Sequence, residues 1–122
     1  MNKYYTRLAI DHFLHPRNAR ELTNADGVGE AVNKAGDTVR FFVRFEADHI
    51  TEAAFKAQGC AATIAAASVL TELALGRSRT SAPLLSLDDV DAALGGLPRF
   101  KLERAAVAVS AVLAALEDAE AS

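Results

Sequence analysis

Polar and apolar residues alternate along two consecutive stretches of the chain, 38–47 and 50–59. One face of the first stretch carries Val39, Phe41, Val43 and Phe45, and the other carries Arg40, Phe42, Arg44 and Glu46. A period of two residues is typical of a β-strand, so the two stretches predict an antiparallel hairpin that turns at Asp48-His49. Residues 29–36, just before them, favour a third strand that ends in a turn.

The remaining apolar patterns have the spacing of helices. Apolar residues recur every three or four positions over 4–14 and again from Leu102 onward, which indicates amphipathic helices. Residues 61–75 are apolar on nearly every side, as is typical of a buried helix. A further helix is expected over 86–94, because Ser86 is a good N-cap and acidic residues follow it in the first turn.

Loops are expected over 16–28 and 77–83, where turn-forming and polar residues gather. Together these elements predict an α+β fold in which a three-stranded antiparallel sheet carries helices packed on one side. A length of 122 residues fits a single domain, spanning 1–122.

Composition and charge argue against several kinds of partner and location. A net charge of −3 argues against nucleic acid as the main partner, which requires a basic surface. The sequence has no run of eighteen apolar residues that could span a membrane. Arg7 and Asp11 interrupt the apolar region that a signal peptide would need. A single cysteine cannot form an internal disulfide, so we expect a cytoplasmic protein.

Cys60 stands where a strand is expected to become a helix. There the amides and dipole of a helix N-terminus can stabilise a thiolate. A cysteine beside a run of alanines can equally pack as a small apolar residue. The local sequence leaves both interpretations open.

Other candidate groups are weak. His12, His15 and His49 share neither a helix face nor a metal-site spacing, which favours surface or capping roles. The glycines form no phosphate-binding loop, and no serine lies in a nucleophile elbow.

Four segments, taken in order, resemble a known family. They are AIDHFLHPRN (9–18), AGD (35–37), FKAQGCAATIAAASVLTELALGRS (55–78) and LPRFKLERAAVAVSAVLAAL (97–116). Over roughly residues 4–117 the chain is similar to the IscU/NifU scaffold proteins of iron–sulfur cluster assembly. The resemblance implies the same small sheet backed by helices and a scaffold protein that is not an enzyme.

The resemblance also implies a site. Scaffolds of this family take sulfur from a cysteine desulfurase and hold a metal ion or nascent [2Fe–2S] cluster through three cysteines, an aspartate and often a histidine. The matching positions here are Ala35, Asp37, Cys60, Glu103 and Arg104. Cys60, Asp37 and Glu103 are thus the implied ligands of iron, zinc or a transient [2Fe–2S] cluster, with the fixed charge of Arg104 nearby. A cluster takes four ligands, so a homodimer with one cysteine from each subunit is one way to complete it.

The partner segment also departs from the family. Leu97, Pro98, Arg99, Phe100 and Lys101 stand where the family has Leu-Pro-Pro-Val-Lys, so we do not expect a chaperone that reads the usual loop to bind well. The desulfurase and other assembly proteins remain the implied partners.

Three hypotheses follow. The first is an iron–sulfur scaffold-like protein that binds a metal ion, transient cluster or persulfide through Cys60. The alternative is a family member that has lost the cluster and acts as an accessory or regulatory partner-binding protein. The third is an unrelated enzyme in which Cys60 is a nucleophile, Asp37 or Glu103 is a base, and Arg104 binds an anion.

Overall fold

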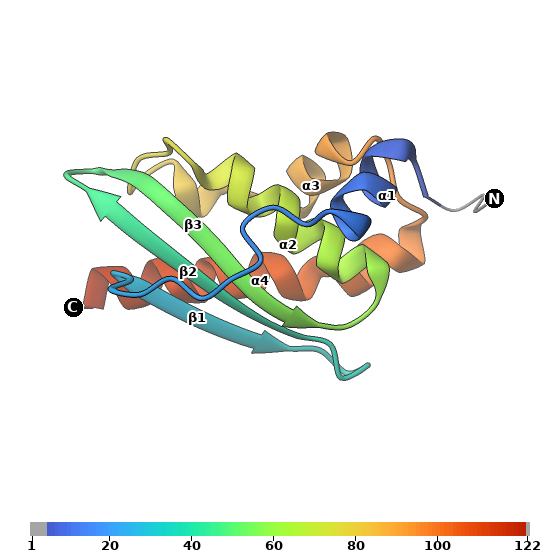
Figure 1. The fold of residues 1–122 in the computed structure, drawn as a ribbon, viewed down its shortest axis with the longest axis horizontal. Helices are drawn as coiled ribbons and strands as arrows, with labels where there is room; N and C mark the ends of the chain where they lie inside the picture. Colours follow the sequence, from blue (N-terminus) through green and yellow to red (C-terminus); the bar gives the residue numbers. More distant parts are fainter. Residues whose placement is uncertain (1–4, 122) are drawn as a thin grey trace.

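The computed structural model describes residues 5–121. Figure 1 shows the course of the chain through these residues. The elements are, in order, α1 (Arg7–Leu14), β1 (Gly27–Val32), β2 (Thr38–Glu46), β3 (His49–Gln58), α2 (Ala61–Ala74), η1 (Ala82–Leu84), α3 (Leu87–Ala93) and α4 (Arg99–Ala121).

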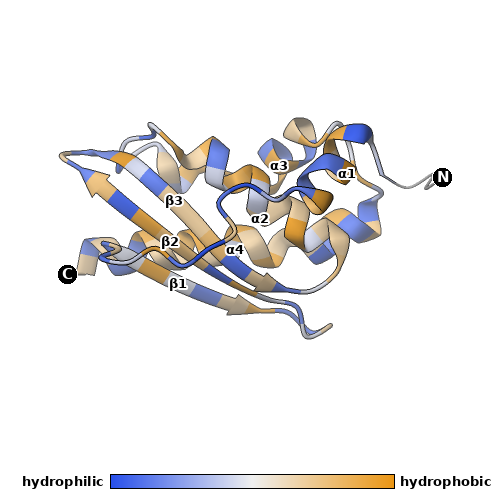
Figure 2. Cartoon of the chain, in the orientation of Figure 1, coloured by the Kyte–Doolittle hydropathy of each residue, from blue (hydrophilic) through white to orange (hydrophobic). Residues whose placement is uncertain are grey.

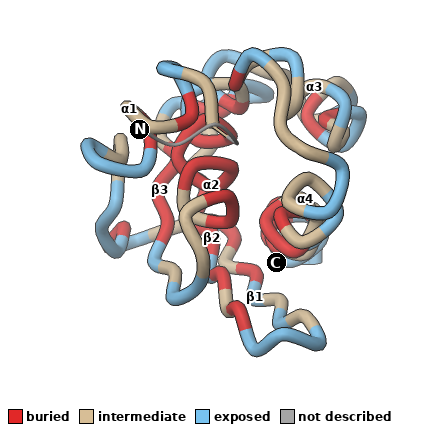
Figure 3. Tube along the Cα trace, turned by 90° about the vertical axis from the view of Figure 1, so that its right-hand side faces the viewer, coloured by how far each residue is buried: buried red, intermediate tan, exposed pale blue. Residues whose placement is uncertain are grey.

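The three strands form one antiparallel sheet in the order β1-β2-β3, and α2 and α4 cover one of its faces (Figure 1). This arrangement confirms the α+β fold expected from the sequence. Phe41 pairs with Phe55 across β2 and β3, and both side chains are buried against the helices. Figure 2 shows the alternating hydropathy along the strands, and Figure 3 shows that buried positions are concentrated in α2 and recur along the strands and α4.

Small residues let β1 lie directly on α4. A Cβ added to Gly27 would stand 2.1 Å from the carbonyl oxygen of Ala115, and one added to Gly29 would stand 2.2 Å from its amide nitrogen. Distances of this size are far below van der Waals contact, so both positions require glycine. The alanine content of α4 and α2 has the same packing role, because small side chains allow backbones to approach.

The other face of the sheet is only partly open. Leu22 and Ala54 pack with Phe42, which explains why Phe42 is buried although it lies on the mainly polar face of its strand. The segment between α1 and β1 supplies this cover, and its Asn18 carbonyl accepts a hydrogen bond from the Phe55 amide at 3.0 Å.

Two helix starts differ from the expectation. The first helix was expected over 4–14, but α1 begins at Arg7 because Thr6 is its N-cap and accepts a hydrogen bond from the Ala9 amide; Tyr4 lies outside the described residues. The last helix begins at Arg99 rather than Leu102, since the carbonyl of Pro98 already accepts hydrogen bonds from the amides of residues 101 and 102.

The third strand, expected over 29–36, is β1 at Gly27–Val32, because residues 33–37 form a turn in which the Gly36 amide donates to the Asn33 carbonyl. The boundaries of α2 and α3 lie close to those expected. Ser86 caps α3 in a capping box with Asp89, as its sequence indicated. Gly76 follows α2 with a φ of +80°, a left-handed conformation suited to glycine. Within residues 5–121, no helix is both long enough and apolar enough to cross a membrane.

Candidate functional site

Cys60 is the N-cap residue of α2 and is separated from the end of β3 by Gly59 alone. Its carbonyl accepts the first helical hydrogen bond, from the amide of Ile64 at 3.1 Å. The thiol is half-buried and makes no capping bond to a backbone amide. Instead Sγ lies 3.5 Å from Oγ1 of Thr63, one turn into the helix. The side chain therefore packs partly against the core and partly faces a polar cluster, which combines features of both interpretations.

The centre of that cluster is Asp37, the last residue of the turn between β1 and β2. Asp37 is only 1% exposed, and its carboxylate accepts four hydrogen bonds. Arg104 donates from Nε at 2.7 Å and from Nη2 at 2.9 Å, and Asn33 Nδ2 and Thr63 Oγ1 each donate at 3.0 Å. The hydrogen bond from Arg104 is the largest influence holding the pKa of Asp37 well below its usual range, against the opposing effect of burial.

Backbone and side-chain packing fix this carboxylate in place. Asn33 accepts a hydrogen bond from the Asp37 amide at 2.9 Å and donates one to the Arg104 carbonyl at 3.1 Å. A Cβ added to Gly59 would stand 2.7 Å from Asp37 Oδ1, so the residue before Cys60 leaves space for the carboxylate. The β1–β2 turn, the β3–α2 junction and α4 thus converge at one point.

Arg104 is the cation of the site. Its side chain is 37% exposed and two of its nitrogens donate to Asp37. The pKa of Arg104 is raised, first by the hydrogen bonds to Asp37 and next by the negative charge of ionised Cys60. The structure therefore brings Cys60, Asp37 and Arg104 together.

Glu103 does not join them. Its side chain is 69% exposed and lies 4.0 Å from Nε of Arg99, one helical turn earlier. Among residues 5–121, no group of three or more His, Cys, Asp or Glu side chains is placed to hold a metal ion. One chain offers a single thiolate, and its nearby carboxylate, Asp37, is already engaged by four donors. This donor set differs from the four ligands that a [2Fe–2S] cluster takes.

The partner segment, residues 97–101, leads into the part of α4 that carries Arg104. Leu97 donates its amide to Asp91 Oδ1 at 2.8 Å, and the next residues, from Arg99, form the first turn of α4 instead of a loop. Phe100 is 59% exposed, and the ammonium of Lys101 lies 5.5 Å from the centre of its ring. The segment therefore presents an aromatic and basic surface.

His12 was expected at the surface or as a cap, and this is wrong. It is 5% exposed, and its Nδ1 lies 2.7 Å from Oγ of Ser68 on α2. The amide of Arg17 also donates to Ser68 Oγ at 2.8 Å, and His12 Nε2 lies 3.5 Å from Glu72. Burial is the main cause that lowers the pKa of His12. Because Ser68 is fully buried, this Ser–His–Glu arrangement joins α1 to α2 and is closed to substrates.

The sequence offered little indication of the residues that hold Asp37 in place. Asn33, Thr63 and Gly59 belong to no recognisable motif, because each contributes through a contact distant in sequence. A polar residue inside an otherwise apolar helix was the available signal for Thr63 and for Ser68, since buried hydroxyl groups need partners.

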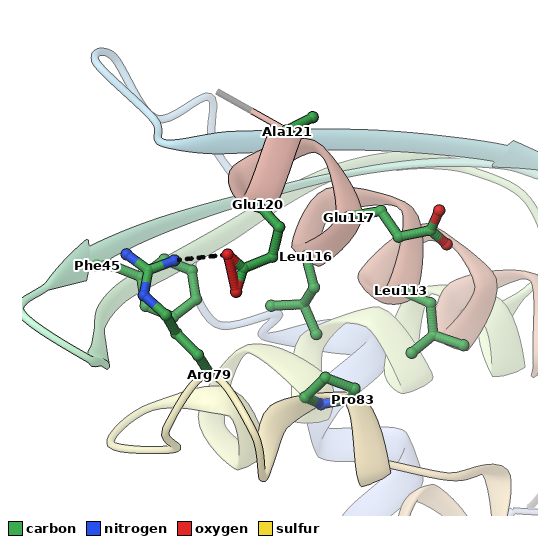
Figure 4. Close-up of a pocket in the computed structure, with 8 residues that line it drawn as sticks. All are labelled: Phe45, Arg79, Pro83, Leu113, Leu116, Glu117, Glu120 and Ala121. Atoms are coloured by element: carbon green, nitrogen blue, oxygen red, sulfur yellow. Dashed lines mark ion pairs between the residues drawn. The ribbon is translucent and has the colours of Figure 1, made fainter.

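A separate apolar groove of about 510 Å³ lies toward the other end of α4. Figure 4 shows Arg79 beside Phe45, with its guanidinium 4.0 Å from the ring centre and its Nη1 3.6 Å from Glu120. The rest of its lining is formed by Pro83, Leu113, Leu116, Glu117 and Ala121. Along α4 this groove begins at Leu113, which lies about 14 Å from Arg104 at a rise of about 1.5 Å per residue, and it contains none of the site residues expected from the sequence.

Comparison with known proteins identifies the family. The model of the NifU-like N terminal domain matches residues 4–121, and the chain belongs to this family. It is 47% identical over 121 residues to the bifunctional protein NifU/MnmA of Rubrobacter xylanophilus, a match that covers 97% of this chain and 25% of that relative. It is 36% identical over 115 residues to the iron–sulfur cluster assembly scaffold protein IscU 1 of Archaeoglobus fulgidus, covering 93% of this chain and 75% of the relative.

Solved structures support the same fold. A NifU-like N-terminal protein from Brucella abortus superimposes with a TM-score of 0.77 at 15% identity, covering 96% of this chain and 94% of that one. A putative SUF-system scaffold from Fervidobacterium islandicum AW-1 gives a TM-score of 0.64 at 20% identity, covering 97% and 95%.

Proposed function

We propose that this protein is a scaffold of iron–sulfur cluster assembly in which Cys60 is the group that receives the cargo. Membership of the NifU-like family and the names of the relatives, several of them assembly scaffolds, support the process. The observation that carries the assignment of the residue is the convergence of Asp37, Thr63 and Arg104 beside the half-buried thiol of Cys60.

The chemistry that one thiolate can perform alone is sulfur transfer. Cys60 thiolate attacks the terminal sulfur of a persulfide carried by a cysteine desulfurase, which we propose as the partner. A new S–S bond forms at Cys60, the S–S bond of the donor breaks, and the donor cysteine leaves as a thiolate. The step consumes no oxidant or reductant, because the sulfane sulfur moves with its oxidation state unchanged.

Iron enters this proposal as cargo that needs ligands from more than one chain. Cys60 supplies one soft thiolate, and thiolates suit iron–sulfur clusters and zinc. The remaining ligands of a transient [2Fe–2S] cluster then come from a second subunit or another assembly protein. Since the thiol must stay reduced to accept sulfur, we also propose a reducing compartment, the cytoplasm.

The test uses protein purified without oxygen and incubated with a cysteine desulfurase, cysteine and ferrous iron. Sulfane sulfur, acid-labile sulfide, iron and zinc are then counted per chain, beside the variant Cys60→Ser. We expect sulfur or metal that depends on Cys60. If the wild-type protein and Cys60→Ser gain neither, while both still bind the desulfurase, the role of Cys60 as cargo group is wrong and an accessory role replaces it.

A further inference from the structure

The guanidinium of Arg104 is fixed in orientation by a buried carboxylate. Its Nε donates to one oxygen of Asp37 at 2.7 Å and its Nη2 to the other at 2.9 Å. Such paired bonds set both the position and the plane of the group. A guanidinium carries five N–H donors, so the two that Asp37 accepts leave three, and Nη1 makes no hydrogen bond with any residue in 5–121.

Within this cluster, Thr63 cannot donate a hydrogen bond to a sulfur anion at Cys60. The single hydroxyl proton of Thr63 is donated to Asp37 at 3.0 Å, so toward Sγ, at 3.5 Å, this oxygen presents lone pairs. Thr63 therefore accepts a hydrogen bond from a neutral thiol but offers none to a sulfur anion. Arg104 donates to the same carboxylate as Thr63, whose hydroxyl lies beside Sγ, and it has N–H donors to spare.

We propose that Arg104 and Cys60 form a binding site for anionic sulfur, in which Arg104 positions the terminal sulfur anion of an incoming persulfide and then of the persulfide on Cys60. This inference rests on the proposed function of Cys60 as sulfur acceptor and names the substrate class of that site. Arg104 is paired with ionised Asp37, but the carboxylate is buried and the guanidinium reaches solvent. A bare metal cation approaching the thiol therefore meets the positive end of the pair, whereas an anionic sulfur species is attracted to it. Arg104 stands where the family has a cysteine, so a guanidinium replaces a soft metal ligand. The site therefore favours an anion over a metal cation.

Two alkylating reagents that differ in charge test whether Cys60 prefers anions. Iodoacetate is an anion and iodoacetamide is neutral, and both react with the thiolate of Cys60 by displacing iodide. The ratio of their rates therefore cancels the fraction of thiolate and reports the local charge. At low ionic strength we expect Arg104→Gln to lower the iodoacetate-to-iodoacetamide rate ratio by about tenfold, and Arg104→Lys to retain most of it. Raising the salt to about 1 M is expected to shrink the difference, because screening then acts within about 3 Å.

Matched variants separate charge from structure. Arg99→Gln removes the same charge from the exposed preceding turn of α4 and is expected to leave the ratio close to wild type. Asp37→Asn disturbs the same hydrogen bonds but keeps the cation, so its ratio should stay or rise. If Arg104→Gln does not fold with Asp37 left unpaired, the double variant Asp37→Asn with Arg104→Gln replaces it and should show the same fall.

Sulfur uptake is measured in parallel with glutathione persulfide and with desulfurase plus cysteine as the two donors. Slower uptake by Arg104→Gln from both donors is expected; slowing with the desulfurase alone would overturn a general sulfur-anion site in favour of a protein contact. Equal rate ratios in wild type and Arg104→Gln would overturn the anion site and leave sulfur uptake at Cys60 standing. A changed ratio without any sulfur uptake would overturn the proposed function and leave the anion site standing.

Discussion

Arg104 of α4 and Asp37, the residue directly before β2, form a two-point ion pair, with Nε–Oδ2 and Nη2–Oδ1 distances of 2.7 Å and 2.9 Å. The carboxylate is buried and the guanidinium reaches solvent, so the pair anchors a cation beside Cys60. The same pair joins the N-terminal part of α4 to the β1–β2 hairpin. Its two roles, stability and charge, can be measured separately.

Asp37→Asn is expected to lower the free energy of unfolding by about 1.5–3 kcal/mol, the range for hydrogen bonds to a charged group. The amide keeps the size of the carboxylate but loses the charge that Arg104 and Asn33 bind. Urea unfolding with a common slope measures the change. Glu21→Gln, at an exposed carboxylate in the segment between α1 and β1, is the control; a loss no greater than in this control would contradict the account of Asp37.

Gly59→Ala is expected to disturb the site through packing. Its Cβ would stand 2.7 Å from Asp37 Oδ1 and so displace the carboxylate from its donors. We expect a fall in the free energy of unfolding of about 1–3 kcal/mol, the usual cost of an extra methyl group in a packed site, measured by urea unfolding. Unchanged stability would show that the carboxylate shifts without cost and would contradict this account of Gly59.

Gly29 of β1 likewise lies against the backbone of α4. Gly29→Ala would place Cβ 2.2 Å from the amide of Ala115, which only a backbone shift can relieve. A loss of at least about 2 kcal/mol is expected from overpacking, measured by denaturant unfolding. Glu30→Ala, the exposed neighbour, should stay within about 0.5 kcal/mol of wild type.

His12 makes stability depend on pH. Its pKa is lowered in the folded protein, chiefly by burial, so the folded state favours the neutral ring. The stability it contributes is present above the unfolded-state pKa of about 6.5 and is lost as pH falls toward the lower folded-state pKa. Denaturant midpoints measured between about pH 8 and 5 should therefore fall with pH, and less steeply in His12→Gln. A parallel fall in both proteins would assign the pH dependence to other groups.

Local patterns were sufficient to predict the sheet, the buried helix and the capped α3, because alternation, apolar periodicity and N-cap chemistry are properties of neighbouring residues. Phe42 and His12 were predicted less well, since their burial depends on the 16–26 segment and on Ser68. These contacts are distant in sequence.

For the site, the resemblance selected Asp37, Cys60 and Arg104, which the structure brings together. It also selected Glu103, which instead lies near Arg99 on the exposed side of α4. A helix advances 100° per residue, so adjacent residues point in different directions and adjacency in sequence does not make Glu103 a neighbour of Cys60. Asn33 and Gly59 act by shape and hydrogen bonding, for which the sequence has no motif.

The most direct test of the central claim is the location of sulfane sulfur after incubation with a desulfurase and cysteine under anaerobic conditions. Intact-mass measurement and peptide mapping follow the wild-type chain beside Cys60→Ser. We predict one added sulfur atom on the peptide that contains Cys60 and none on the serine variant. An unmodified wild-type chain, under conditions in which a three-cysteine IscU scaffold is loaded, would contradict the assignment of Cys60 as the cargo residue.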